Sequence, residues 1–341
     1  MQTAVKKYFF TGLKLGVAFL LLWHVGKDLD YGSLKKLSPA GLCTGFLLSM
    51  FLILLQTTLT ALRWNMLLQG QGIKLSFFRV LSLTFQGNMF SLFLPGGSVG
   101  GDVLKAAFLA KEAKKSGAVE GVTTILLDRL IGMLGLFSLT GMIALCSLGQ
   151  IRAFPAGIRY TVYLLMFCCV GGVLGGILIF LHTLLFKVQI FAKLLQKADS
   201  FTKGTCSRIL HAVEVCRKDR ATFWKTFFLT LLILHPILIG CNILILYSLD
   251  NQKTENIALA QKAALAASLG NVASVAPVSP GGLGTRDKVT EIILQASGIR
   301  KEKCALVPLI YSCASVLSAL LPGLFFFLWD AFGKLRSGIK E

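Results

Sequence analysis

The stretch Pro95-Gly96-Gly97-Ser98-Val99-Gly100-Gly101-Asp102 interrupts a long apolar part of the chain and ends in a carboxylate. A second stretch of the same kind occurs late in the sequence, Pro280-Gly281-Gly282-Leu283-Gly284-Thr285-Arg286-Asp287. In both stretches an Asp stands seven residues after the first Pro, and a Gly-Asn pair precedes that Pro (Gly87-Asn88 and Gly270-Asn271). Proline and clustered glycines end a helix and release backbone N–H and C=O groups. The two stretches therefore predict two matched breaks between helices.

The sequence around these breaks is strongly apolar. Apolar residues make up 55% of the 341 residues, and charged residues make up only 15%. Several apolar runs of about 20 residues are each long enough to cross a hydrocarbon core of roughly 30 Å. In hydrocarbon, released backbone groups are tolerated only where they are buried in protein or line a wet cavity. Two such breaks in corresponding halves of a membrane chain indicate the binding site of a transporter.

Composition bounds the class of protein. The apolar runs predict an all-α, polytopic integral membrane protein, and the short connections leave no room in residues 1–341 for a separate soluble domain. The net charge of +19 arises from Lys and Arg residues that flank the apolar runs, where they orient spans and meet anionic lipid. We therefore expect no nucleic-acid partner. The nine cysteines include no C-x-x-C pair and no Cys/His cluster, so we expect neither a metal site nor a disulfide framework.

The apolar runs predict about six full spans and two re-entrant hairpins. In the second span, Arg63-Trp64 is expected to act as an interfacial anchor, with the Trp at headgroup depth and the Arg in water. Each hairpin is an apolar run that enters the membrane, breaks at Pro-Gly-Gly and returns through a short helix. The expected spans are 8–25, 40–62, 119–148, 160–182, 227–249 and 304–329, and the expected hairpins combine 75–94 with 102–115 and 257–278 with 287–297.

Charge distribution sets the expected topology. Residues 187–225 contain nine Lys or Arg residues against three acidic ones, which places this segment in the cytoplasm. The other basic segments can then also lie on the sides that their charge predicts only if residues 75–94 turn back at the glycines instead of crossing the membrane. The result is an inverted four-plus-four repeat, with repeat one at about 8–148, repeat two at about 160–330 and both termini in the cytoplasm. The basic segment 184–225 is expected to lie on an anionic leaflet, or else to be a solvated connector.

Charged and polar residues beside the breaks are the candidate substrate ligands. A helix N-terminus offers free N–H groups and a partial positive charge, which suit a phosphate, and Arg adds a fork that grips phosphate oxygens. If the two hairpins enter from opposite sides, their tips share one polar cavity near the bilayer middle. The candidate residues are Asn88, Pro95, Gly96, Gly97, Gly101, Asp102, Lys105, Asp128, Arg129, Asn271, Pro280, Gly281, Gly282, Gly284, Arg286, Asp287 and Glu291.

Two alternatives compete with substrate binding. In the first, Asp128-Arg129 and Arg286-Asp287 neutralise one another and only hold the hairpins in place. In the second, the chain is an enzyme, a lipid transferase that uses Asp102 as its base. No nucleophile–base pair, metal motif or P-loop accompanies the glycines, so we expect no catalytic residues and no cofactor.

These residues resemble a known family. Arg63-Trp64, Asn88, Leu94 to Asp102, Leu127-Asp128-Arg129 and Pro277 to Gly284 are similar to the lysylphosphatidylglycerol synthase transmembrane domain, also called the flippase-like family. The resemblance covers nearly the whole chain and implies movement of a lipid between leaflets. In bifunctional members a cytosolic domain makes the aminoacylated lipid, and this chain resembles the stand-alone members that lack it. It departs from the family at Asp287, where Glu is expected, and at Lys105, where Arg is more usual.

The sequence therefore predicts a flippase of the cytoplasmic (inner) membrane for an amphipathic lipid with an anionic or phosphate-containing head group. The alternatives are a membrane-embedded transferase acting on a lipid-linked substrate, and a non-transporting partner of a lipid-modifying enzyme. Membrane lipids are the expected partners, with a lipid-modifying enzyme as a second one. Nothing in the sequence indicates a nucleotide site, so transport would be facilitated or ion-coupled.

Overall fold

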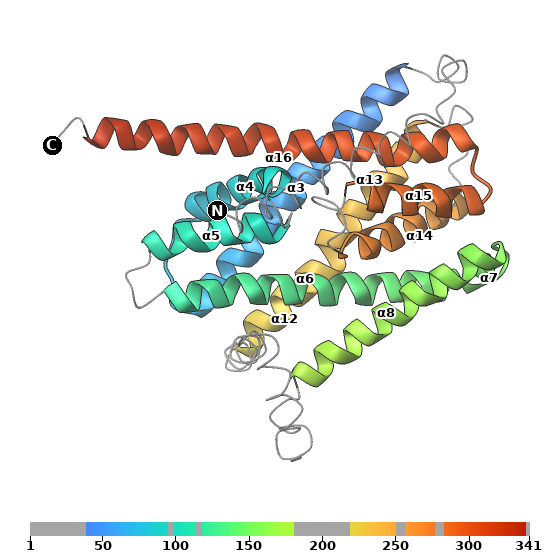
Figure 1. Ribbon diagram of the computed structural model, residues 1–341, viewed down its shortest axis with the longest axis horizontal. Coiled ribbons are helices and arrows are strands. Elements are labelled where there is room, and N and C mark those ends of the chain that lie inside the picture. The colour runs from blue at the N-terminus through green and yellow to red at the C-terminus, as the bar shows by residue number, and fades with distance from the viewer. Residues whose placement is uncertain are drawn as a thin grey trace, which may run out of the picture.

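A computed structural model describes residues 39–94, 98–112, 118–180, 219–249, 257–276 and 283–338. Within these ranges all regular secondary structure is helical, which confirms the all-α prediction (Figure 1). The helices are α3 (Pro39–Gly70), α4 (Phe77–Phe93), α5 (Ser98–Glu112), α6 (Ala118–Cys146), α7 (Leu148–Arg152), α8 (Ala156–Phe180), α12 (Arg220–Leu229), the π-helix η2 (Thr230–Leu234), α13 (His235–Ser248), α14 (Ile257–Ala273), α15 (Thr285–Ala296) and α16 (Lys301–Gly338).

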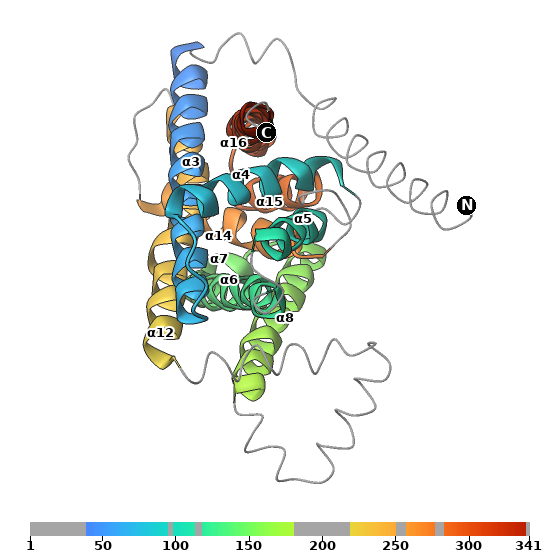
Figure 2. The ribbon, with the colours of Figure 1, turned by 90° about the vertical axis from the view of Figure 1, so that its left-hand side faces the viewer.

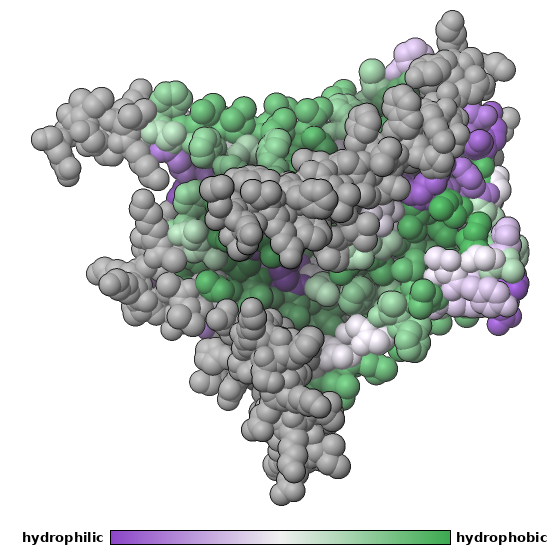
Figure 3. Space-filling view, in the orientation of Figure 1, coloured by the Kyte–Doolittle hydropathy of each residue, from purple (hydrophilic) through white to green (hydrophobic). Residues whose placement is uncertain are grey.

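Five helical segments in the described ranges are long and apolar enough to cross a membrane. Large apolar side chains on their outer faces are exposed, for example Phe167, which is 74% exposed on α8. Most of the coloured surface in Figure 3 is apolar, and hydrophilic residues lie mainly along its right-hand edge. The protein is therefore a multi-pass membrane protein. The expected span 8–25 lies outside the described residues. The five segments are Pro39–Gly70, Gly121–Cys146, Ala156–Leu178, Arg220–Ser248 and Lys301–Phe332.

Both predicted breaks coincide with helix ends. Helix α4 begins after Ser76, whose hydroxyl accepts a hydrogen bond from the Arg79 N–H, and it ends before Leu94, which has an extended backbone. At 1.5 Å per residue, the 17 residues of α4 and of α14 span about 26 Å, less than a hydrocarbon core. Each is followed by a shorter helix that packs against it, α5 against α4 and α15 against α14. The Pro-Gly-Gly residues 95–97 and 280–282 themselves lie outside the described residues.

The two helical hairpins lie between two long helices. Figures 1 and 2 show α4–α5 and α14–α15 side by side, with α16 along one side of them and α6 along the other. Helix α4 packs against α16, and α14 packs against α6, so each hairpin contacts the long helix that follows the other hairpin in the chain. Helices α3 and α13 pack together and cross this layer.

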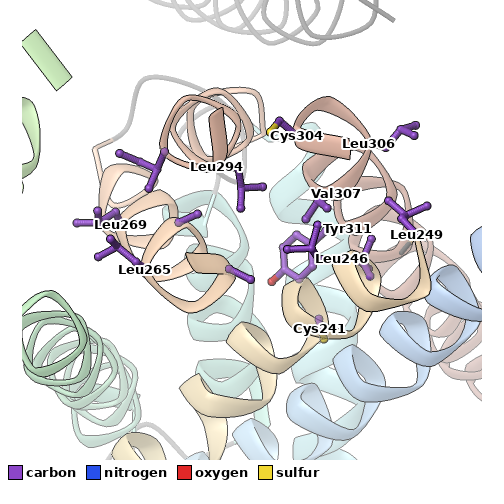
Figure 4. Close-up of a cluster of buried hydrophobic side chains, with 14 of the residues drawn as sticks. Cys241, Leu246, Leu249, Leu265, Leu269, Leu294, Cys304, Leu306, Val307 and Tyr311 are labelled. Atoms are coloured by element: carbon purple, nitrogen blue, oxygen red, sulfur yellow. The ribbon is translucent and has the colours of Figure 1, made fainter. Parts of the chain in front are cut away.

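The largest buried cluster lies where α13, α14, α15 and α16 meet (Figure 4). Leu246, Leu265 and Leu294 are each at most 1% exposed, and each comes from a different helix. Burying such a side chain stabilises the fold by about 1.5–3 kcal/mol, although part of that gain is also available in lipid. The polar residues of α15 therefore lie on a helix that apolar packing holds firmly in place.

Two sequence expectations need correction. Helix α3 continues past Leu62 to Gly70, so Arg63 and Trp64 lie inside the helix, where they are 6% and 2% exposed. They are buried contacts rather than an interfacial anchor, because their polar groups find partners on α6 and η2.

Most of the basic segment, residues 184–218, lies outside the described residues. The part that is described starts α12, where the Asp219 carboxylate caps the helix by accepting a hydrogen bond from the Thr222 N–H at 3.1 Å. Hydrogen bonds from Thr222 lower the pKa of Asp219 below its usual value. The cap fixes where the apolar segment that contains η2 begins.

Candidate functional site

The first charged cluster is centred on an ion pair between α5 and α6. Arg129 Nε donates to Asp102 Oδ2 at 2.6 Å, and Arg129 Nη2 donates to Asp102 Oδ1 at 2.9 Å. This is the bidentate geometry in which a guanidinium grips a carboxylate or a phosphate. The Asp102 side chain is 15% exposed, whereas that of Arg129 is 45% exposed. The pair thus has a protected anion and an accessible cation.

Lys105, one turn further along α5, faces the same carboxylate. Its Nζ lies 3.9 Å from Asp102 Oδ1 and 5.3 Å from the centre of the Trp64 ring. Its side chain runs so close over α4 that a Cβ at Gly87 would lie 2.6 Å from Lys105 Cε. A glycine at position 87 therefore makes room for a buried cation beside Asp102.

Asp128, the chain neighbour of Arg129 on α6, adds a second ion pair to this first cluster. Arg63 Nε donates to Asp128 Oδ1 at 2.8 Å, and Arg63 Nη1 donates to the Thr230 hydroxyl at 2.8 Å. The three side chains come from α3, α6 and η2, and both charged groups are at most 10% exposed. A buried pair of this quality stabilises the arrangement mainly because losing either partner would leave an uncompensated charge.

The π-helix beside this pair also contributes a contact. Residues 230–234 form η2 immediately before His235 and Pro236, where a proline disturbs regular α-helical hydrogen bonding. His235 Nε2 lies 2.9 Å from the Gly132 carbonyl oxygen, so this nitrogen carries the proton and donates it. The contact joins the segment that contains η2 and His235 to α6.

The second charged cluster, at the start of α15, is closed on itself. Arg286 Nε donates to Asp287 Oδ1 at 3.1 Å, and Arg286 Nη2 donates to the Ser312 hydroxyl at 2.5 Å. Ser312 in turn donates to Asp287 Oδ2 at 2.7 Å, and the guanidinium lies 4.4 Å from the centre of the Tyr311 ring. The exposed fractions are 10% for Arg286 and 1% for Asp287. This pair is shielded on all sides by its partners.

Asp287 also fixes the start of its helix. Its Oδ2 accepts a hydrogen bond from the Gly284 N–H at 2.9 Å, and Gly284 has φ of +83°, a backbone conformation that favours glycine. One turn later Glu291, 1% exposed, accepts from Lys288 and Gln295, each at 2.9 Å. The acidic residues of α15 are thus engaged in local structure.

The two Gly-Asn pairs make matching contacts. In α4 the Ser91 hydroxyl donates to the Asn88 carbonyl at 2.6 Å, and in α14 the Ser274 hydroxyl donates to the Asn271 carbonyl at 2.6 Å. The Asn271 Nδ2 group is buried and has no hydrogen-bond partner among the described residues. The C-terminal ends of α4 and α14 therefore share a G-N-x-x-S motif.

The structure brings together some predicted site residues and separates others. Asp102, Lys105 and Arg129 form one group, and Arg286 pairs with Asp287 as the structural alternative expected. Asp128 and Arg129 instead take different close partners, Arg63 and Asp102. Of the predicted residues, Pro95, Gly96, Gly97, Pro280, Gly281 and Gly282 lie outside the described residues.

Sequence reasoning missed several partners because they come from distant helices. Arg63, Thr230 and Ser312 are such cases. A further contact joins α4 to α16, where Arg79 pairs with Asp330 and the Gln86 amide donates to Asp330 Oδ2 at 2.8 Å. Each of these side chains is a polar residue within an apolar run. This isolation was the one sequence signal that could have suggested that they have buried partners.

Comparisons with known proteins identify the family of the chain. A relative among curated proteins, the UPF0104 membrane protein PH1989 of Pyrococcus horikoshii, is 25% identical over 130 residues, and the alignment covers 38% of this chain and 38% of the relative. The family model described as "Lysylphosphatidylglycerol synthase TM region" matches residues 11–323, which include both charged clusters. The chain therefore belongs to the family of the lysylphosphatidylglycerol synthase transmembrane region.

Proposed function

We propose that the protein moves an amphipathic lipid with an anionic, phosphate-containing head group between the two leaflets of its membrane. The observation that carries the proposal is the bidentate Asp102–Arg129 pair beside the α4–α5 break, in which Arg129 is 45% exposed. A charge at membrane depth costs several kcal/mol unless it is paired or reaches water, so an accessible cation in such a place favours a role with substrate.

Packing supports a second part of the proposal, that the chain is an inverted repeat. The hairpins α4–α5 and α14–α15 pack reciprocally, α4 on α16 and α14 on α6. A Cβ at Gly87 or at Gly270 would collide with the returning helix of its own hairpin, with Lys105 in one case and Thr290 in the other. We place the two hairpins as re-entrant elements that enter from opposite sides, in a cytoplasmic membrane with both termini in the cytoplasm.

Reconstituted vesicles test the proposal. Vesicles of phosphatidylglycerol and phosphatidylcholine would contain a trace of acyl-labelled fluorescent phosphatidylglycerol, and dithionite added outside would quench the label in the outer leaflet. The intact protein should allow nearly complete quenching, because inner-leaflet lipid moves outward. Asp102→Asn and Arg129→Gln should each abolish this movement at normal protein yield. Arg152→Gln, which changes an exposed cation on α7, is the matched control and should leave the rate unchanged.

The result also separates the alternatives. If Asp102→Asn and Arg129→Gln fail to insert or unfold in detergent, the pair serves structure rather than substrate. A transferase would convert the lipid into a new species, which mass spectrometry of the same vesicles would detect. Both Asp102 oxygens already accept hydrogen bonds from Arg129, which argues against Asp102 as a base. A protein that needs a partner enzyme would move no lipid alone.

A further inference from the structure

Charge balance differs between the two clusters and bears on which head group the proposed flippase would accept. The first cluster contains three basic side chains, Arg63, Lys105 and Arg129, and two carboxylates, Asp102 and Asp128. The second contains two basic side chains, Arg286 and Lys288, and two carboxylates, Asp287 and Glu291. Among the described residues of these clusters, the first therefore has one positive charge in excess, and the second is neutral.

The contacts show where the excess charge lies. Arg63 and Asp128 satisfy each other at 2.8 Å. The remaining carboxylate, Asp102, faces two cations, Arg129 at 2.6 Å and Lys105 at 3.9 Å. Asp102 cannot neutralise both, so the group of three carries the excess. Arg129 is the more accessible of the two cations, because the Lys105 side chain is only 8% exposed.

Resting on the proposed function, we infer that the head group carries a single net negative charge, and that its phosphate binds Arg129 in place of Asp102. The guanidinium fork fits two phosphate oxygens as it fits two carboxylate oxygens. The released Asp102 keeps a cation, because Lys105 already lies beside it. Six charges then form three pairs: phosphate with Arg129, Asp102 with Lys105, and Asp128 with Arg63. Asp102 acts as an internal anion that holds the site closed when no lipid is bound.

The second cluster takes no part in this exchange. Arg286 is held by Asp287, by Ser312 and by the Tyr311 ring, and it is 10% exposed against 45% for Arg129. An incoming phosphate would have to break several buried contacts and would leave Asp287 without its cation. The two hairpins are thus matched in fold but differ in function, and substrate selectivity belongs to the cluster between the first hairpin and α6.

The three kinds of head group then differ in the charge that each leaves in the cluster. A head group with one net negative charge leaves the cluster neutral. A zwitterionic head group leaves one positive charge, and a lysyl-modified head group, whose ammonium groups outweigh its phosphate, leaves more. Since uncompensated charge is costly away from water, phosphatidylglycerol should move at least tenfold faster than phosphatidylcholine, and lysylphosphatidylglycerol should move more slowly still.

The experiment measures all three lipids with the same acyl label in vesicles that contain the full chain. Lys105→Met removes one charge, keeps the Asp102–Arg129 pair and preserves side-chain length, so the preference for phosphatidylglycerol over phosphatidylcholine should fall about tenfold. Lys301→Met, an exposed lysine at the start of α16, is the matched control and should keep the preference of the unchanged protein. Ser312→Ala tests the second cluster and should lower the unfolding temperature without changing the preference.

Each outcome is decisive. If none of the three lipids moves, the proposed function fails. If lipids move at equal rates, or lysylphosphatidylglycerol moves fastest, the function stands and the charge-balance inference is overturned. An unchanged preference in Lys105→Met would also overturn it, because Lys105 would then carry no charge that matters. Should Lys105→Met not fold, the substrate order of the unchanged protein alone still decides.

Discussion

Close backbone approach, rather than a turn, explains the glycine at position 101. A Cβ on Gly101 would lie 2.2 Å from the Gly87 carbonyl oxygen on the neighbouring helix, closer than atoms can come. In the other hairpin the counterpart of Gly87 makes the close approach, because a Cβ on Gly270 in α14 would lie 2.9 Å from the Arg286 carbonyl oxygen. Backbone atoms cannot move aside as a side chain can, so both helical hairpins depend on these glycines for their tight packing.

Gly101→Ala should accordingly lower the free energy of unfolding by about 1–3 kcal/mol, the usual cost of overpacking. Thermal unfolding in detergent measures this as a lower midpoint than that of the unchanged protein. Gly171→Ala is the control, since nothing lies within 4 Å of a Cβ there and alanine favours a helix. Equal midpoints for the two variants would mean that α4 and α5 pack less closely than described.

At this scale the sequence could identify most charged residues of interest but not their partners. Asp102 and Arg129 stand out as charges in apolar surroundings, but the sequence suggested Asp128 as the partner of Arg129, which in the structure pairs with Asp102. The Arg286–Asp287 pair involves chain neighbours and was predicted. The Arg63–Asp128 pair joins residues 65 apart in the chain, and the short-range spacing of residues does not encode such a contact. Its absence from the predictions led to the wrong location for Arg63.

Among the secondary-structure elements, α3 shows how one ion pair fixes a helix in place. Arg63 reaches Asp128 on α6 and Thr230 on η2, so a single side chain joins three helices. The Thr230 hydroxyl also donates to the Thr226 carbonyl at 2.7 Å, which keeps its lone pairs turned toward Arg63. The π-helix therefore has a packing role, because it sets the position of the hydroxyl that completes this contact.

A double-mutant cycle tests the contact. Arg63→Met should cost about 3–5 kcal/mol of stability, because Asp128 would remain buried without its partner. Adding Asp128→Leu should recover much of that loss, since the uncompensated charge disappears as well. The measurement is the unfolding midpoint of the two single variants and the double variant in detergent. Simple additivity of the two losses would show that the residues do not interact.

The ends of elements were predicted with mixed success: α6 and α13 end within two residues of the expected positions, whereas α14 ends at Ala273, five residues before the expected end. Helix α4 was expected to end near residue 94 and does end at Phe93. Helix α3 was expected to end at Leu62 and continues to Gly70. An Arg-Trp pair after an apolar run is typical of a chain that leaves the membrane at its interface. Arg63 and Trp64 lie inside a buried helix instead, because their partners come from other parts of the fold.

For the whole molecule, the packing of two hairpins between α6 and α16 is consistent with the predicted order of elements, but a membrane orientation is still a prediction (Figure 2). The expected sharing of one cavity by the two hairpin tips is also untested, because both Pro-Gly-Gly stretches lie outside the described residues. The amino-acid sequence predicts which segments are helical and their order along the chain. The side of the membrane from which each hairpin enters is predicted only from the charges of the loops.

Thiol labelling tests that orientation. Cys206 and Cys216 lie in the basic segment, which charge bias assigns to the cytoplasm. In a chain whose other cysteines are replaced by serine, both should react with an impermeant maleimide only after the membrane is opened. Labelling in intact cells would contradict the cytoplasmic assignment and, with it, the inverted arrangement of the two halves.

The contact between Arg79 and Asp330 has a consequence for how the chain matures. The two residues lie 251 positions apart, so the first hairpin receives its covering helix only after all the residues between them have been synthesised. Until then Arg79 and Gln86 lack their carboxylate and the α4 surface lacks its neighbour. Contacts between such distant residues form late and leave intermediates exposed to quality control. A ribosome that stalls before α16 would therefore leave a product marked for degradation rather than a partly working half.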